Sequence, residues 1–387
     1  MAKNGVIALS AKELDRLRVL HRVKEGALKL KDAAIILNLS RRQISRIWER
    51  FRNWGASGLV HRARGIPSNR RKDDALRVDV LRIYEEHYTD FGPTLASEKM
   101  KELHGLEVNR ETLRRWLIGA CLWPGKTRHR KHRKRRRRKE HFGEMVQLDG
   151  SDHTWFEDRA KRSCMMVMVD DATGISQGHM CSTETTQDAL FILRKWIEKY
   201  GVPVSLYTDR KNIYVTNRPP NRKERREGTG ALTDFGQVCA RLGIQIIPAG
   251  SPQAKGRIER KNGVLQDRFV KELRIRSISG IQKTNSILDE FMEGLNRRFG
   301  KPPMSEANYH RHLPPKADLD HLLRLERTRC LHKDWTFEYK GVIYQINAKA
   351  PFLQPGVKLT LCETLDGKLV VQFRGNEIPF LLIGRKL

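Results

Sequence analysis

The feature that most limits how this chain can fold is a block of basic residues about a third of the way along it. Residues 126–140, KTRHRKHRKRRRRKE, hold four Lys and seven Arg among fifteen positions. Such a run has no apolar side chains to bury, so we expect it to stay extended until phosphates neutralise it. The block must therefore separate parts of the chain that fold on their own. A nuclear-localisation signal has the same composition, so the block alone does not decide its use.

The excess of positive charge extends to the whole chain. Its 387 residues include 75 Lys and Arg against 45 Asp and Glu, which gives a formal net charge of +30 at pH 7. A surplus of this size favours a polyanionic partner, and nucleic acid is the usual one. The charge leaves a ribosome-associated protein and a membrane-surface binder as alternatives. Hydrophobic residues make up 39% of the chain, which is enough for the cores of two to four domains.

Cysteine spacing and the first residues indicate in which cellular compartment the protein is found. The six cysteines are scattered and form no CxxC pair, which predicts neither a structural zinc site nor a disulfide framework. The first residues lack the apolar segment of a signal peptide, and no stretch is apolar for long enough to cross a membrane. We therefore expect a cytoplasmic protein that stays in a reducing compartment with access to DNA and has no membrane partner.

Residues 1–60 have the pattern of a helix-turn-helix domain. Capping boxes at Ser10 and Ser40 predict the starts of two helices, and a short helix over 30–37 lies between them. The helix after Ser40 has one apolar stripe and one basic face, which suits it to the major groove of DNA. The plainer alternative is a helical hairpin with a solvated basic face. The residues expected to contact DNA are Arg41, Arg42, Gln43, Ser45, Arg46 and Arg50.

A second helical unit is expected over 74–123, after a basic linker at 61–73. The linker, rich in Gly, Pro and Arg, suits either an arm along a DNA groove or a flexible connection. A helix beginning at Asn109 would direct Arg110, Arg114 and Arg115 outward, so this unit is a second candidate for DNA binding. The basic block then forms a further linker, 124–141, in which Arg133, Arg135 and Arg136 are expected to bind phosphates.

From residue 142 the pattern changes to alternating strands and helices. Three strands at 146–149, 164–170 and 175–181 precede a helix, a fourth strand, a second helix, a fifth strand and a long helix from about 254. This order predicts an α/β domain over 142–276. We expect a helical connector over 277–330, and then period-two alternation over 331–387 that predicts a small five-stranded β-barrel.

Three acidic residues of the α/β domain could converge. Asp149 lies within the apolar strand EMVQLDG, where an ionised carboxylate needs a cation to balance it. Asp209 ends a buried strand, at the edge where α/β sheets place ligands. Glu259 lies near the start of the long helix, with Asn262 and Gln266 expected on the same polar side. Such a set could bind two hard cations through oxygen alone and support an in-line displacement at phosphorus.

The nearby acids have simpler explanations. Asp170 and Asp171 suit a turn between strands, and Asp234 suits the start of a helix. Any single carboxylate, taken alone, is more simply a surface charge or a helix cap. The proposed set therefore depends on the convergence of all three.

Three motifs give the chain a family resemblance. The stretches QLDGS at 147–151, LYTD at 206–209 and SPQAKGRIE at 251–259 resemble DDE transposases and retroviral-type integrases with a ribonuclease-H-like core. The resemblance is greatest to bacterial insertion-sequence transposases of the ISNCY group, and it covers nearly the whole chain. It implies a catalytic and metal-binding triad of Asp149, Asp209 and Glu259, with Mg²⁺ or Mn²⁺ as cofactor and two ions per site.

One departure from the family pattern concerns the second acid. Asp209 and Glu259 are 50 positions apart (259 − 209), whereas about 35 intervening residues are commoner in the family. The excess falls in the polar, basic segment 216–230, which we expect to loop out from the core. This segment leaves Asp234 as an alternative to Asp209.

The resemblance implies a multidomain transposase that acts in DNA transposition, integration and recombination. Its expected partners are the terminal inverted repeats of a mobile element and target DNA, bound by a homodimer or higher oligomer. The alternatives are a DNA-binding regulator with an inactive core and a ribonuclease-H-like nuclease without strand transfer. The core residues expected to contact DNA are Lys255, Arg257 and Lys261.

Overall fold

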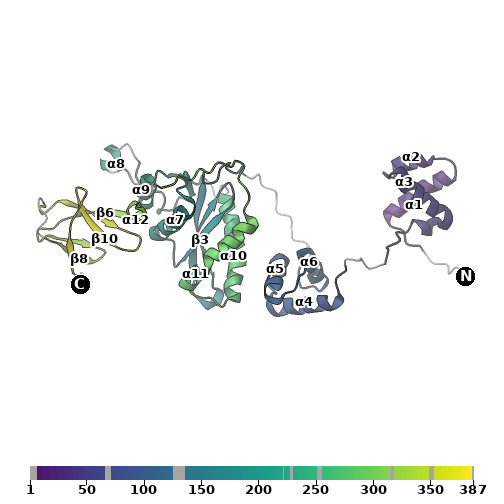
Figure 1. The fold of residues 1–387 in the computed structure, drawn as a ribbon, viewed down its shortest axis with the longest axis horizontal. Coiled ribbons are helices and arrows are strands. Elements are labelled where there is room, and N and C mark those ends of the chain that lie inside the picture. The colour runs from purple at the N-terminus through teal and green to yellow at the C-terminus, as the bar shows by residue number, and fades with distance from the viewer. Residues whose placement is uncertain are drawn as a thin grey trace. The chain divides into compact units, whose positions relative to one another are not determined.

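The computed structural model describes most of the chain. The described residues are 7–65, 71–124, 136–220, 222–226, 230–250, 255–313, 318–347 and 353–385. The chain divides into two units, Met1–His129 and Arg130–Leu387, and each is described by itself (Figure 1). Arg133 and Arg135 lie outside the described residues, so the structure does not place them. In the described parts, no helix is both long and apolar enough to span a membrane.

The first unit begins with the expected helix-turn-helix. Helices α1 (Ala11–Lys24), α2 (Leu30–Ile36) and α3 (Arg41–Trp54) are followed by a 3₁₀ turn, Gly55–Leu59. The capping boxes at Ser10 and Ser40 are both formed, which confirms the two helix starts. The helices enclose one apolar cluster made of Leu20, Ala33, Ala34, Ile44, Ile47, Phe51 and Leu59.

Three further helices follow in the same unit. They are α4 (Asp74–His87), α5 (Pro93–His104) and α6 (Arg110–Gly119). Their buried residues include Val80, Tyr84, Met100, Leu113 and Leu117. The Tyr84 hydroxyl donates to the carbonyl of Phe91 at 2.9 Å, so the buried phenol has a partner.

The second unit contains a five-stranded mixed sheet. Its strands are β1 (Val146–His153), β2 (Ser163–Asp170), β3 (Ser176–Cys181), β4 (Ser205–Thr208) and β5 (Gln245–Pro248). Their order is β3-β2-β1-β4-β5. β1, β2 and β3 form an antiparallel meander, while β4 lies parallel to β1 and β5 parallel to β4. This is the strand arrangement that the ribonuclease-H-like resemblance implies.

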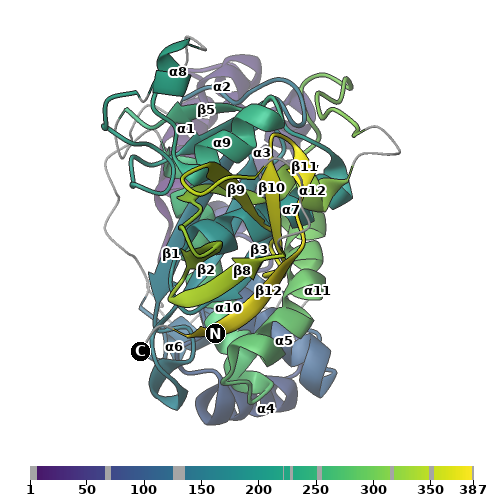
Figure 2. The ribbon, with the colours of Figure 1, turned by 90° about the vertical axis from the view of Figure 1, so that its left-hand side faces the viewer.

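Helices cover both faces of the sheet (Figures 1 and 2). α7 (Thr186–Tyr200) and α9 (Asp234–Arg241) pack on one face, and α10 (Gly256–Ile275) and α11 (Ile281–Phe299) on the other. Alternation along β2 sorts its side chains between the two: Met166 and Met168 join the first cluster, Met165 and Val167 the second. α11, expected in the connector, thus belongs to the core packing.

The insertion and the chain beyond the core contain short elements. Within 216–230 the structure has a helix, α8 (Arg222–Arg226). After α11 come α12 (Leu319–Leu323) and β6 (Leu325–Cys330). β6 pairs with β9 over six residues although its sequence, LERTRC, has no apolar alternation. Backbone pairing therefore forms a strand in a segment where the sequence pattern predicts a helical connector.

The C-terminal segment differs from the expected five-stranded barrel. One sheet has the order β11-β10-β9-β6 and a second the order β12-β8-β7, with β12 beside β8 (Figure 2). Within the described residues the two open sheets do not close into a barrel; they pack over one cluster that includes Phe337, Leu359 and Val371. The strands not named so far are β7 (Thr336–Tyr339), β8 (Val342–Ile346), β9 (Lys358–Glu363), β10 (Leu369–Phe373), β11 (Asn376–Glu377) and β12 (Phe380–Arg385).

Candidate active site

Asp149 lies on the face of β1 that α10 covers. It pairs across the sheet with Val167, whose side chain belongs to the cluster beneath α10. Because directly opposed residues share a face, the side chain of Asp149 is directed toward α10. Asn262 of α10 donates its Nδ2 proton to Asp149 Oδ2 at 3.3 Å. The strand register therefore decides which face of the sheet carries this carboxylate.

Two similar contacts flank this one and hold α10 along β1. The backbone N–H of Ile258 donates to Gln147 Oε1 at 3.2 Å, and Gln266 Nε2 donates to Ser151 Oγ at 3.1 Å. Four residues of a helix rise about 6 Å and two residues of a strand about 6.6 Å. Every fourth residue of α10 can therefore contact every second residue of β1. The polar side that the sequence predicted for α10 is thus confirmed at Asn262 and Gln266, and it faces β1.

Asp209 lies beside Asp149 on the neighbouring strand. β1 and β4 are parallel, with Gln147 opposite Tyr207, and two residues further along each chain places the two aspartates at one level. The ammonium of Lys255 lies between them, 2.7 Å from Asp149 Oδ1 and 3.9 Å from Asp209 Oδ2. Asp234, the alternative to Asp209, instead forms a two-pronged ion pair with Arg327. The structure therefore favours Asp209 as the partner of Asp149.

Burial sets the electrostatics of the pair. Burial raises the pKa of Asp149, the charges of Lys255 and Lys211 oppose that change, and Asp209 adds to it. A raised pKa means that the ionised carboxylate is unfavourable in this position unless cations surround it. Lys255 is itself 7% exposed, so the strongest local cation is also withdrawn from water.

Glu184 is a further carboxylate, connected to Asp209 through the ammonium of Lys211, and the sequence motifs do not include it. It precedes Thr185, the N-cap of α7, and its Oε1 accepts a hydrogen bond from the hydroxyl of Tyr214 at 2.8 Å. Lys211 Nζ lies 2.5 Å from Glu184 Oε2 and 3.5 Å from Asp209 Oδ2. The only sequence signal for this contact is Gly150, whose missing side chain leaves space for the Glu184 carboxylate.

Glu259 is not brought to the two aspartates in this structure. It lies in the first turn of α10 and is exposed, whereas Ile258, one residue earlier, is the one turned to β1. Among the described residues, no three Asp, Glu, His or Cys side chains come close enough to hold a metal ion together. The geometry therefore joins two members of the predicted triad and leaves the third apart.

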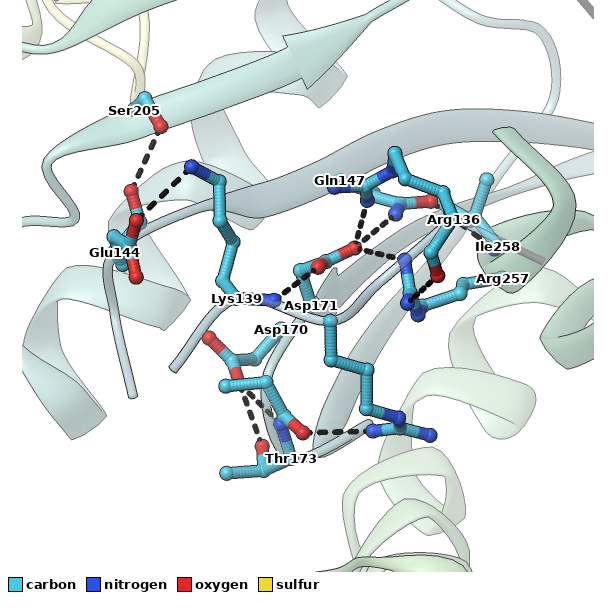
Figure 3. A network of polar contacts seen from close by, with 12 residues as sticks. Arg136, Lys139, Glu144, Gln147, Asp170, Asp171, Thr173, Ser205, Arg257 and Ile258 are labelled. Atoms are coloured by element: carbon cyan, nitrogen blue, oxygen red, sulfur yellow. Dashed lines mark hydrogen bonds and ion pairs between the residues drawn. The ribbon is translucent and has the colours of Figure 1, made fainter. Parts of the chain in front are cut away.

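A buried network fixes the start of α10, as Figure 3 shows. At its centre is Asp171, whose side chain is fully buried. Its Oδ1 accepts from Gln147 Nε2 at 2.7 Å, from Arg257 Nη1 at 2.8 Å and from Arg136, and its Oδ2 accepts from the backbone N–H of Lys139 at 2.9 Å. Asp171 thus links the basic linker, β1 and α10, which turn chemistry alone does not predict.

Several residues expected to bind DNA have partners inside the chain. Arg136 and Arg257 bind Asp171, and Lys255 binds Asp149. In α6, Arg114 and Arg115 both pair with Glu111. Burial lowers the pKa of Lys261 to about 8. Arg110 is exposed on α6.

The recognition face of α3 is more open. Arg41, Arg42, Gln43, Ser45 and Arg46 are exposed, and Arg50 is half-buried. Two of these polar side chains also serve the helix itself. Gln43 Oε1 accepts from the backbone N–H of Ser40 at 3.0 Å, and the hydroxyl of Ser45 donates to the carbonyl of Arg41 at 2.9 Å.

Comparisons with known proteins agree on one class. Residues 15–67 match a family model described as a helix-turn-helix domain. The chain is 38% identical over 382 residues to the putative transposase y4bF of Sinorhizobium fredii, covering 97% of this chain and 82% of that protein. It is 26% identical over 325 residues to the transposase for insertion sequence IS1202 of Streptococcus pneumoniae, covering 74% of this chain and 68% of that protein.

Solved structures show a weaker similarity. The cryo-EM structure of a simian T-cell lymphotropic virus intasome with the PP2A regulatory subunit B56 gamma matches with 17% identity and a TM-score of 0.35, over 80% of this chain and 99% of that one. The HTLV-2 integrase catalytic core in complex with magnesium matches with 17% identity and a TM-score of 0.30, over 41% and 88%.

Proposed function

Because this chain belongs to the DDE transposases with a ribonuclease-H-like core, we propose that it cuts and joins DNA strands with Asp149, Asp209 and Glu259 as its metal-binding carboxylates. The protein is a DNA-binding transposase. The observation that supports the proposed chemistry is the meeting of Asp149 and Asp209, on adjacent parallel strands, around one ammonium group.

The residues at this position fit a hard divalent cation. Mg²⁺ and Mn²⁺ prefer carboxylate and amide oxygens, and both aspartates offer carboxylates. Asn262 is 8% exposed, and its Oδ1 is a buried oxygen without a hydrogen-bond partner among the described residues. Its amide nitrogen is already bound to Asp149, so the free oxygen lies beside that carboxylate. The ammonium of Lys255 shows that a positive charge is stable there.

Each residue has a separate task in the proposed reaction. Asp149 and Asp209 hold the cations, and Asn262 fixes the orientation of Asp149. The chemistry that bound Mg²⁺ or Mn²⁺ supplies is activation of a water or a DNA 3′-hydroxyl and stabilisation of the leaving oxygen, in the two-ion arrangement. Lys255 must leave the aspartates when a cation binds, and it is then free to contact a DNA phosphate.

Glu259 is proposed as the third carboxylate in the assembled complex. It is exposed and has no ion pair among the described residues, so no partner must be broken to move it. It also lies in the first turn of α10, directly after the residue whose backbone binds Gln147. Glu259 lies one helical turn from both Lys255 and Asn262, which contact Asp149, so the proposal requires only that its side chain turns toward the aspartates when DNA and metal bind.

The other parts of the chain are assigned by the same proposal. The helix-turn-helix domain at 1–60 and the helical unit at 74–123 bind the terminal inverted repeats, and the linkers at 61–73 and 124–141 bind phosphates. The core at 142–276 cuts and joins. Because two element ends must be joined in concert, a dimer or higher oligomer on DNA is proposed. An inactive-core regulator is disfavoured by the intact pair of aspartates.

Cleavage of a DNA end by the purified full-length protein tests the proposal. With Mg²⁺ or Mn²⁺ and a duplex that carries one end of the element, wild-type protein should cut, while D149N, D209N and E259Q should bind the duplex and fail to cut. D152N is the matched control, because Asp152 is an exposed aspartate of the same strand that pairs with Arg162. Cleavage by D149N at the wild-type rate would contradict the proposal. A target plasmid added to the reaction separates a transposase, which gives joined product, from a nuclease, which does not.

A further inference from the structure

Glu184 lies against the backbone of the proposed cation site. Its side chain is 11% exposed, and a Cβ atom at position 150 would come within 2.4 Å of its Oε2. Gly150 follows Asp149 directly, so Glu184 is packed beside the residue next to a proposed metal ligand. Any other residue at position 150 would displace this carboxylate.

Two contacts fix where Glu184 is and what it holds. The hydroxyl of Tyr214 donates to Oε1, and Tyr214 is 3% exposed, so this end of the carboxylate is held by a buried group. The other oxygen, Oε2, binds the ammonium of Lys211. Lys211 is therefore closer to Glu184, at 2.5 Å, than to Asp209, at 3.5 Å. Glu184 draws this cation away from Asp209.

The local charge balance depends on Glu184. Asp149, Asp209 and Glu184 contribute three negative charges, and Lys211 and Lys255 contribute two positive ones. The five groups together carry one net negative charge, which attracts a divalent cation. Without Glu184 the two aspartates would face two ammonium groups, and the net charge would be zero. Lys211 would then no longer be held by Glu184 and could pair fully with Asp209.

We propose that Glu184 is a positioning residue of the cation site, which holds Lys211 away from Asp209 and so keeps Asp209 available to a divalent metal ion. The proposal rests on the proposed function, because it takes Asp149 and Asp209 as the residues that bind the ion. It assigns no metal contact to Glu184 itself. Its effect passes through Lys211, which distinguishes it from a fourth ligand.

Mn²⁺ binding to the full-length protein without DNA tests this role. Free Mn²⁺ is followed by electron paramagnetic resonance during a titration, so the readout does not depend on catalysis. E184Q keeps an acceptor for Tyr214 but removes the charge, and it should bind Mn²⁺ about tenfold more weakly or worse, as expected when a unit charge close to a partly buried site is lost. K211M should bind at least as tightly as wild type, and E184Q/K211M should recover most of the lost affinity.

Two controls separate this effect from others. E293Q makes the same substitution in the Lys199–Glu293 ion pair between α7 and α11, which also measures 2.5 Å and shares no residue with the site, and it should leave Mn²⁺ affinity unchanged. D149N should abolish the binding. Thermal melting of each metal-free variant reports whether it is folded, and the K211M measurement still tests the proposal if E184Q does not fold.

Each outcome decides between the proposals. Wild-type affinity in E184Q, with binding lost in D149N, would overturn the role of Glu184 and leave the proposed function standing. A loss in E184Q that K211M does not restore would also overturn it, because the effect would not pass through Lys211. Absence of any Mn²⁺ binding sensitive to D149N in wild-type protein would overturn the role of Glu184, because the charge balance around the two aspartates would then not attract an ion; the cleavage assay with DNA decides the proposed function separately.

Discussion

Replacing Asp171 by Asn should destabilise the second unit more than any ordinary surface change. Asp171 is fully buried and is the shared acceptor of Arg136, Arg257, Gln147 and the backbone of Lys139. Asn retains the size and one acceptor oxygen, but it removes the negative charge and turns an NH₂ group toward donors. The two guanidinium groups then lose the carboxylate that balances them.

The magnitude follows mainly from Arg257. Its side chain is 12% exposed, and burial lowers its pKa, an effect that the charge of Asp171 opposes. Removing one partner of a buried ion pair costs about 3–5 kcal/mol. Arg136 is 38% exposed and can turn to water, so we take the lower end, about 3 kcal/mol. For a unit of this size that corresponds to a melting temperature lower by about 6–12 °C.

Hydrogen exchange in rising urea, followed by mass spectrometry, is the assay. It reports the free energy of unfolding segment by segment, so peptides from β1 and α10 can be compared with peptides of the first unit. D152N is the matched control: it removes the same charge from an exposed Asp–Arg pair, whose side chains are 62–63% exposed, and should cost less than about 1 kcal/mol.

The double variant D171N/R257M tests the cause. If the cost arises from an uncompensated guanidinium, removing Arg257 as well should recover part of it, and the two single changes should not add. A loss in D171N no larger than that in D152N would refute the reasoning, because the network would then contribute no more than a solvated pair.

Three further predictions concern other parts of the chain. Burial lowers the pKa of His310 to about 4, so between about pH 4 and 6.5 the unfolded chain binds a proton that the folded chain does not. The free energy of unfolding should therefore fall as the pH drops through this window, and His310→Gln should remove that dependence, as measured by the urea midpoint at each pH. Gln43→Ala should lower both DNA affinity and the melting temperature of the first unit by removing a capping contact, whereas Arg46→Ala should lower affinity alone; equal melting in both would contradict the dual role of Gln43. Gly58→Ala should destabilise the first unit by roughly 1–3 kcal/mol, since the new Cβ would lie 2.3 Å from the carbonyl oxygen of Arg50, and an unchanged thermal midpoint would show that this turn can shift.

The sequence predicted the elements whose residues repeat with a clear period. The helix starts at Ser10 and Ser40 were found because capping boxes are local, and both are formed. The strands of the core were found because buried strands such as β2 are almost wholly apolar. The pairing of β1 with β4, and hence the meeting of Asp149 and Asp209, follows from family resemblance and cannot be read from local pattern.

Contacts between distant residues of unlike type were not predictable from the sequence. Asp171 looks like a turn residue, because nothing in its neighbourhood shows that Arg136 and Arg257 will reach it from 35 and 86 positions away. The strand β6 was missed for a related reason: its stability comes from pairing with β9 and not from alternation of its own residues. The prediction of a barrel is wrong because an alternating pattern specifies the strands but not which strand pairs with which.

Charge has two uses in this chain, and the structure separates them. The net charge of +30 indicates DNA binding. Yet three cations of the second unit that were expected to contact DNA, Arg136, Lys255 and Arg257, are bound to Asp171 or Asp149. Lys255 can reach a phosphate only when another cation replaces it at Asp149, and a phosphate that attracts Lys255 favours the entry of that cation. Metal binding at Asp149 and phosphate binding by Lys255 are therefore coupled, and each strengthens the other by the same factor. On the proposed function, the core is therefore held inactive by its own lysine until DNA and metal are both present.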